Sequence, residues 1–232
     1  MQRTTGHLRL GFRSVDSRTT LSTLFQQGAA KARFPKVPLS LPPEAVIINT
    51  AGGLTGGDRL SVEIGLEPGA AATVTTQACE RIYRSAAGAA AVETMLRLES
   101  GAELDWLPQE TILFDRGRLV RRIAIDIAAA ASLLAAESVV FGRTARGESV
   151  EEGLWSDRWR IRRDGRVIFA DGISLKGPIA KILARPAVLA GARAFATIVY
   201  VAADAAALLN GLRAALAAGP AEAGASQRDG LL

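Results

Sequence analysis

The chain has 232 residues, of which 49% are hydrophobic and 22% are charged, and its formal net charge at pH 7 is +5. This length and apolar content allow a buried core within one domain, and an aromatic content of 5% means that small aliphatic side chains must build most of that core. A single cysteine excludes an internal disulfide and so favours the cytoplasm, while no uncharged stretch approaches the roughly 20 residues of a membrane-spanning helix.

Strands are predicted for most of the chain between residues 6 and 201. Apolar and polar side chains alternate with a period of two, for example over 59–66 and 94–98, as in half-buried strands. Turn residues separate these runs, and the Asp-Gly pair at 164–165 is typical of a tight hairpin. We therefore expect a mostly β chain that forms a single domain over residues 1–232.

Residues 51–58 form a Gly-rich loop. No Gly-Lys-Ser/Thr sequence ends the loop, and strand alternation follows it where a phosphate-binding loop would lead into a helix. The loop is therefore interpreted as a tight turn that needs positive φ and is capped by Asp58. Its glycines are Gly52, Gly53, Gly56 and Gly57.

A repeated turn follows. Residues 66–70 (Leu-Glu-Pro-Gly-Ala) and 98–102 (Leu-Glu-Ser-Gly-Ala) are near-copies whose glycines lie 32 positions apart, and residues 127–131 resemble a degraded third copy. Such self-similarity predicts a stacked-strand, β-helix-like scaffold. With one weak copy among three, chance similarity stays an alternative.

Polar side chains follow the repeated strands at similar distances from these turns. They are Gln77, then Gln109 and Glu110, then Glu137. Stacking of the copies would place them in one internal column. Surface loops produce the same pattern, so both interpretations stay open.

The end of the chain changes character. Residues 195–201 predict a strand, and Asp204 is predicted to cap a helix over about 204–218 that ends at Gly219-Pro220. A polar segment, 219–232, follows, and its last three residues resemble the start of another strand, so we expect the chain to end before its domain does. The apolar face of the helix consists of Leu208, Leu209, Leu212 and Leu216.

Catalytic and tight metal sites have little support. The only histidine is His7, and Cys79 has no evident base beside it, so nucleophilic catalysis and a tight zinc or iron site are not predicted. Carboxylates can still hold a divalent ion weakly, although ion pairs such as Arg143 with Glu148 explain several of them equally well. These carboxylates are Asp58, Glu80, Glu110, Asp115, Glu137, Glu148 and Asp171.

The positive charge raises the alternative of a basic nucleic-acid-binding β-domain. The cations are mostly arginines scattered along the chain, with short clusters at 121–122 and 158–163, and no basic tail or repeated aromatic platform accompanies them. Arginine suits an acidic protein partner at least as well. A nucleic-acid partner is therefore the less favoured interpretation.

Ordered motifs carry a family resemblance. Residues 49–60 (Asn-Thr-Ala-Gly-Gly-Leu-Thr-Gly-Gly-Asp-Arg-Leu) resemble the signature loop of the UreD family of urease accessory proteins, called UreH in some bacteria. Further segments that resemble the family follow in the right order at 75–85, 107–115, 141–148 and 164–171.

This resemblance implies a mostly β fold with stacked strands and a few helices, and a role in urease maturation that is not enzymatic. Members bind UreF, through it the GTPase UreG, and the urease apoprotein, and nickel passes through an internal tunnel. The resemblance thus implies transient nickel and no tightly bound cofactor. UreD proteins usually continue for another strand and a helical tail. The matching positions expected to matter are Asp58, Thr76, Gln77, Tyr83, Arg84, Ser85, Glu110, Glu137, Arg143, Glu148 and Asp171.

Overall fold

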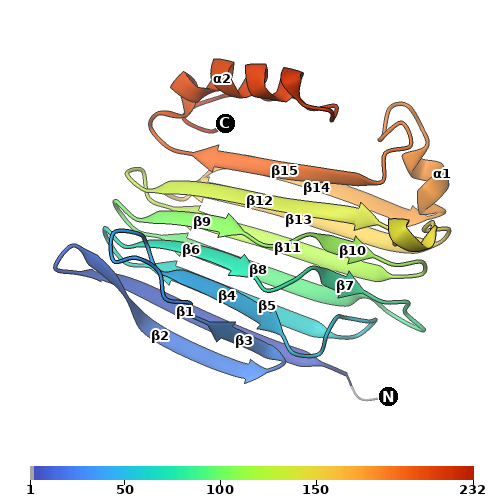
Figure 1. Cartoon of the computed structure of the whole chain (residues 1–232), viewed down its shortest axis with the longest axis horizontal. Helices are drawn as coiled ribbons and strands as arrows, with labels where there is room; N and C mark the ends of the chain where they lie inside the picture. Colours follow the sequence, from blue (N-terminus) through green and yellow to red (C-terminus); the bar gives the residue numbers. More distant parts are fainter. Residues whose placement is uncertain (1–2) are drawn as a thin grey trace.

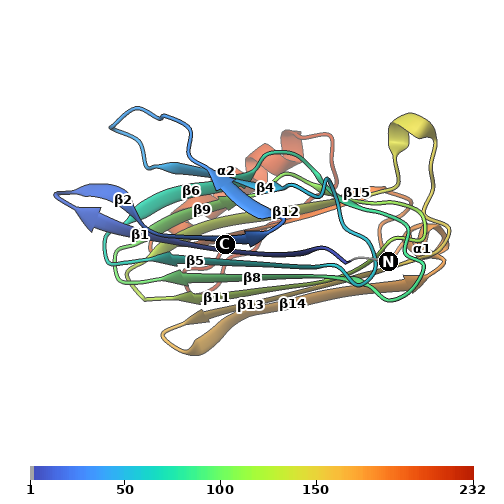
Figure 2. The same cartoon turned by 90° about the horizontal axis from the view of Figure 1, so that it is seen from below.

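Two β-sheets that face each other make up most of the computed structural model, which describes residues 3–232 (Figures 1 and 2). Sheet A has seven strands in the spatial order β14-β13-β11-β8-β5-β1-β2, and sheet B has eight. Sheet A consists of β1 (Thr5–Val15), β2 (Arg18–Gly28), β5 (Arg59–Leu66), β8 (Ala90–Leu98), β11 (Arg118–Ile127), β13 (Gly153–Arg163) and β14 (Arg166–Gly177). Sheet B consists of β3 (Ala30–Arg33), β4 (Glu44–Asn49), β6 (Ala71–Thr76), β7 (Glu80–Ile82), β9 (Glu103–Leu107), β10 (Thr111–Leu113), β12 (Ser132–Phe141) and β15 (Ala194–Val201).

The chain winds in coils that stack in parallel. In sheet A, β1, β5, β8, β11 and β13 pair in this order, each parallel to the strand of the next coil. In sheet B, β4, β6, β9 and β12 do the same. Each coil therefore adds one level to both sheets, which confirms the predicted stacked-strand, β-helix-like scaffold. The antiparallel hairpins β1–β2 and β13–β14 close the two ends of sheet A.

The repeated turns carry this stacking. The same hydrogen bond closes each one: Ala70 N donates to Glu67 O (3.1 Å), Ala102 N to Glu99 O (3.0 Å) and Ala131 N to Ala128 O (3.0 Å). Consecutive turns also bond to each other, since Gly69 N donates to Ser100 O (3.0 Å) and Ala128 N to Leu98 O (2.9 Å). The third, degraded copy is thus a real member of the stack, and chance similarity is ruled out.

The core lies between the sheets and is largely aliphatic, as the composition predicts. Alternate residues of the stacked parallel strands point inward, for example Leu8, Leu10 and Phe12 of β1, all at 1% exposure or less. Buried alanines such as Ala45 and Ala90 allow close packing between levels.

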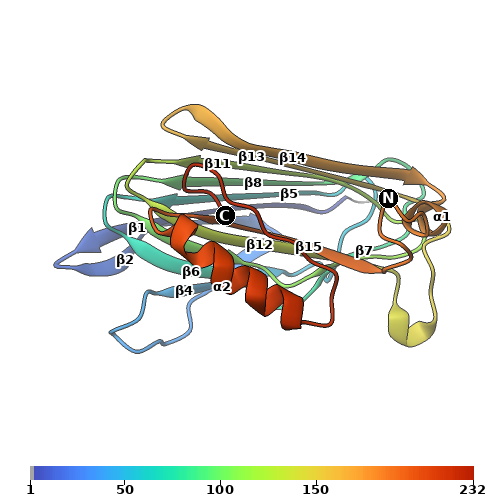
Figure 3. The ribbon, with the colours of Figure 1, turned by 90° about the horizontal axis from the view of Figure 1, so that it is seen from above.

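Helices are few and lie outside the two sheets. Helix α2 (Ala205–Ala218) matches the predicted helix and lies beyond β15 at one end of the stack (Figures 1 and 3). Its apolar face is only partly covered, because Leu208 and Leu212 remain 46% and 38% exposed. Two short helical segments were not predicted, η1 (Thr144–Arg146) and α1 (Ile179–Leu183). Within residues 3–232, no helix combines the length and apolarity needed to cross a membrane.

The predicted helix cap is wrong in its chemistry. Asp204 does precede α2, but its backbone has φ −92° and ψ 2°, outside the extended conformation of most N-caps, and its side chain makes no capping bond. Its carboxylate instead accepts a hydrogen bond from the Tyr200 hydroxyl (2.9 Å). The last three residues, predicted to start a strand, form only isolated bridges, although Leu232 and Tyr200 exchange backbone hydrogen bonds of 2.7 and 2.8 Å.

Alanine substitution of a turn glycine tests the stacked turns. Gly101 has φ +68°, which costs a residue with a side chain about 1–2 kcal/mol. Gly101→Ala should therefore lower the free energy of unfolding by about this amount, as measured by urea denaturation. Gly65→Ala is the matched control, because Gly65 lies in β5 with open space at its Cβ position. The control should be neutral or slightly stabilising, and equal losses in both variants would contradict the assignment.

Candidate functional site

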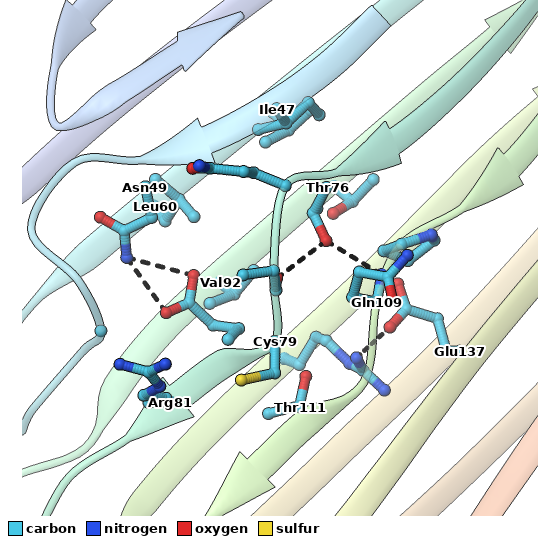
Figure 4. Close-up of a pocket in the computed structure, with 18 of the residues that line it drawn as sticks. Ile47, Asn49, Leu60, Thr76, Cys79, Arg81, Val92, Gln109, Thr111 and Glu137 are labelled. Atoms are coloured by element: carbon cyan, nitrogen blue, oxygen red, sulfur yellow. Dashed lines mark hydrogen bonds and ion pairs between the residues drawn. The ribbon is translucent and has the colours of Figure 1, made fainter.

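A cavity of about 190 Å³ lies between the two sheets (Figure 4). It exists because sheet B is interrupted at the same level in two coils, between β6 and β7 and between β9 and β10. Pro108, which cannot donate to a ladder, lies in the second interruption. Gln77, Ala78 and Gln109 line the cavity and are exposed, so they mark its mouth.

The walls combine apolar and polar side chains. Leu60, Val62, Val92 and Leu119 of sheet A form the apolar wall. The polar groups in the interior are Asn49, Thr76, Glu80, Thr94, Trp106 (through its indole N–H), Thr111, Arg121 and Glu137.

Glu137 lies at the inner end of this cavity and both its oxygens are bonded. Oε1 accepts from Trp106 Nε1 (3.0 Å), and Oε2 forms a short ion pair with Arg121 Nη1. Burial raises the pKa of the Glu137 carboxyl, and the attraction of Arg121 opposes this shift. Glu137 is thus buried and held between two donors.

Arg121 joins this carboxylate to a second one. Its Nε donates to Asp157 Oδ1 (3.0 Å) and its Nη2 to Asp157 Oδ2 (2.5 Å), and its guanidinium lies 5.1 Å from the Trp155 ring centroid. Burial by itself lowers the pKa of Arg121, but Glu137 and Asp157 together raise it. The side chains of Arg121, Glu137 and Asp157, which we call the buried triad, are each 6% exposed, and the triad links the two sheets.

Glu80 is a second carboxylate in the cavity, and it lacks such a cationic partner. Both of its oxygens accept from the Asn49 amide Nδ2 at 3.1 Å, as the dashed lines from Asn49 in Figure 4 show. Burial raises the pKa of the Glu80 carboxyl from its ordinary 4.5 to about 7, against the smaller opposing effects of Asn49 and Arg81. Glu80 can therefore change its protonation state near neutral pH.

Asp58 is placed elsewhere and caps the Gly-rich loop, as predicted. Its Oδ1 accepts from Thr4 N and its Oδ2 from Thr55 N, both at 2.8 Å, and it does not line the cavity. The loop also has the expected conformation, with positive φ at Gly52, Gly53 and Gly57.

The segment 83–85 packs directly on this loop. The Tyr83 hydroxyl donates to Gly52 O (3.1 Å), and a Cβ at Gly53 would meet the Tyr83 ring at 2.4 Å. Thr55 Oγ1 donates to Arg84 O (2.9 Å), and a Cβ at Gly56 would fall 1.9 Å from Ser85 Oγ. The first two motifs of the sequence are therefore one structural unit, and Gly53 and Gly56 are needed for close approach.

Arg143 and Glu148 form the predicted ion pair at the same end of the stack. Arg143 Nε and Nη2 each donate to a Glu148 oxygen at 2.8 Å, and hydrogen bonds from Arg143 lower the pKa of Glu148. The Arg143 guanidinium lies 4.4 Å from the Phe114 ring centroid, and Phe114 contacts Tyr83 edge-to-face at 5.1 Å. These contacts connect the loops of three coils.

The expected polar column is only partly correct. Gln77, Gln109 and Glu137 line one cavity, but Glu110 does not. Thr76 also lines the cavity and accepts from Gln109 N (2.9 Å), whereas Asp171 is exposed on the edge strand β14. Glu110 departs from the column because it lies in the break between β9 and β10, where the alternation of side chains restarts.

Sequence reasoning missed most of the polar interior. Arg121 belongs to the short basic cluster at 121–122, but the alternation Leu119, Arg121, Ile123 places it on the inward face of β11. Asp157 lies between inward-facing Trp155 and Trp159 in the same way. A charge at a core position was the signal that could have found both. Within residues 3–232 there is no group of three or more His, Cys, Asp or Glu side chains that could hold a metal ion.

Comparison with known proteins identifies relatives along the whole described chain. The sequence profile of the UreD urease accessory protein family matches residues 4–232. A urease accessory protein UreD of Xanthobacter autotrophicus is 50% identical over 231 residues, which are 100% of this chain and 79% of that protein. Those of Rhizobium rhizogenes and Azorhizobium caulinodans are 51% identical over 199 residues (86% and 72% of the two chains) and 43% identical over 231 residues (100% and 85%).

Removal of the cation from the buried triad should destabilise the fold strongly. Arg121→Met leaves Glu137 and Asp157 buried without a counter-charge, and breaking such a pair typically costs about 3–5 kcal/mol. Arg122→Met is the matched control, because the Arg122 side chain is 60% exposed and pairs with Glu93, which is also exposed. The free energy of unfolding should therefore change by less than about 0.5 kcal/mol. Chemical denaturation measures both, and similar losses would show that burial of the ion pair is unimportant.

Glu80 should make stability depend on pH. Its folded-state pKa of about 7 exceeds the ordinary 4.5. The contribution of protonated Glu80 to the free energy of unfolding is therefore fully present below pH 4.5 and is lost as the pH rises through 7. The full difference amounts to about 3 kcal/mol. The original chain and Glu80→Gln should therefore have similar free energies of unfolding near pH 5, and Glu80→Gln should be the more stable of the two above pH 7. Denaturation measured from pH 5 to 8 tests this. A constant difference would show that Glu80 does not titrate in this range.

Proposed function

Because the chain belongs to the UreD family of urease accessory proteins, we propose that it acts as a chaperone that assists nickel insertion into the urease active site and catalyses no reaction itself. Family membership over residues 4–232 carries this proposal, and it places the chain in urease maturation. We further propose that the chain is one domain and acts in the cytoplasm.

The inter-sheet cavity supports a path for nickel. A divalent ion in an apolar interior has a large desolvation cost, and polar walls reduce that cost. This cavity offers carboxylate, hydroxyl and amide oxygens, which bind a borderline cation weakly enough to release it. Transient passage of nickel, rather than storage, fits these donors.

The motif residues divide into two groups in this proposal. Thr76, Gln77 and Glu137 line the cavity and would serve the path. A second group shapes the loop surface at one end of the stack and would serve recognition of other proteins. This second group consists of Asp58, Tyr83, Arg84, Ser85, Arg143 and Glu148. Glu110 and Asp171 belong to neither group.

UreF, UreG through UreF, and the urease apoprotein are the proposed partners. The partly exposed apolar face of α2 supports association with another protein, because exposed apolar patches often mark interaction sites. The alternative, nucleic-acid binding, has less support. Arg121 is buried, and Arg9 and Arg122 on sheet A pair with Glu63 and Glu93.

A deletion experiment tests the proposal. Deleting this gene from a urease-positive host that keeps its structural genes should abolish most urease activity at ordinary nickel concentrations and lower the nickel content of purified urease. Excess nickel should restore activity in part, and re-expression of the chain should restore it fully.

Normal nickel loading without the gene would refute the proposed role. Affinity purification of the chain separates the two candidate functions, since recovery of UreF supports maturation and recovery of DNA or RNA without UreF supports the alternative. Retention on heparin does not distinguish the two functions, because any basic protein shows it.

A further inference from the structure

We propose that Glu80, and not Glu137, is the carboxylate through which the cavity binds a divalent cation in transit. The inference rests on the proposed function and assigns a cation-binding residue within it.

Glu137 already has a cationic partner. Its two oxygens bond to Trp106 Nε1 and Arg121 Nη1. A metal ion at Glu137 would have to displace a guanidinium that also donates two hydrogen bonds to Asp157, or lie close to its positive charge. Both arrangements are unfavourable. The first leaves a buried arginine partly unpaired, and the second places two positive charges close together.

Glu80 has no such cation bonded to it within residues 3–232. A single neutral N–H₂ group, Asn49 Nδ2, serves both of its oxygens at 3.1 Å, whereas a carboxylate has about four acceptor sites. Among residues 3–232, no Lys, Arg or His side chain forms an ion pair with it, and its neighbour Arg81 is exposed. Only the neutral Asn49 amide and the weaker influence of exposed Arg81 offset the part-buried charge of Glu80, so a cation in the cavity would stabilise it.

Two hydroxyls line the same cavity. Thr94 and Thr111 line the cavity and are each 5% exposed, yet neither side chain takes part in a hydrogen bond within the described chain. Among residues 3–232, Trp155 Nε1 is the one side-chain polar atom that is both fully enclosed and unbonded. The two threonine hydroxyls are unbonded but not fully enclosed, so their oxygens are accessible. Thr111 is also the direct strand partner of Glu80 between β7 and β10. One carboxylate and two hydroxyls suit weak, reversible binding of a divalent ion.

Nickel binding measures this directly. Equilibrium dialysis of the purified chain, alone or with UreF, against nickel chloride at pH 7.5 should show at least a 10-fold weaker affinity for Glu80→Gln. Thr111→Val should weaken binding about threefold. The exposed carboxylate variant Glu93→Gln is the matched control and should bind as the original chain does. Thermal melting identifies folded variants, and Glu80→Gln, which removes only a buried charge, should melt no earlier than the original chain.

Unchanged nickel affinity in folded Glu80→Gln would overturn the inference, as would equal losses in Glu80→Gln and Glu93→Gln. Complementation of the deletion strain keeps the two proposals apart. If the original chain restores nickel loading and Glu80→Gln does so equally well, the assignment of Glu80 fails and the maturation role stands. If deletion has no effect on urease, the maturation role itself fails.

Discussion

The in-register stacking of coils is the constraint on which the rest of this structure depends. Each strand of sheet A pairs with its equivalent in the next coil, so inward positions fall into columns across the levels. One such column runs through Leu60, Val92, Arg121 and Asp157, which are Cα partners in successive strand pairs. The same stacking that builds the aliphatic core therefore sets Arg121 beside Asp157, 36 residues away in the sequence. A shift of one residue would turn both charges out of the core.

The cavity results from a difference between the two sheets. Sheet A runs without a break through β5, β8 and β11, whereas sheet B is interrupted between β6 and β7 and between β9 and β10. In these breaks no strand residues fill the interior. Polar groups from both sheets face the space that remains. The buried triad fixes one end of this space with an ion pair, while Glu80 accepts side-chain hydrogen bonds only from the neutral Asn49 amide. A carboxylate fixed by an ion pair, Glu137, and one without an ion pair, Glu80, thus lie in the same cavity.

Stacking also explains why the motifs of the sequence occur together. The loop 51–58, the segment 83–85 and residues Phe114, Arg143 and Glu148 belong to successive coils, and each coil contributes one loop to the same end of the stack. Contacts between them run from Gly52 and Gly53 through Tyr83 and Phe114 to Arg143. Residues that are separated along the chain become one continuous surface, while Asp58 works locally to hold its own loop.

The sequence by itself determined the features that depend on neighbouring residues. These are the strand alternation, the repeated turns at 66–70, 98–102 and 127–131, a Gly-rich turn with positive φ, a helix over about 204–218, and the family. It did not determine which carboxylate is free and which is paired, and so it favoured Glu137 over Glu80. Those answers depend on contacts such as Asn49 with Glu80 and Trp106 with Glu137, each spanning 31 residues. Only the tertiary structure decides them, because the register between coils and the breaks in sheet B set which side chains meet, and burial of those side chains sets their charge.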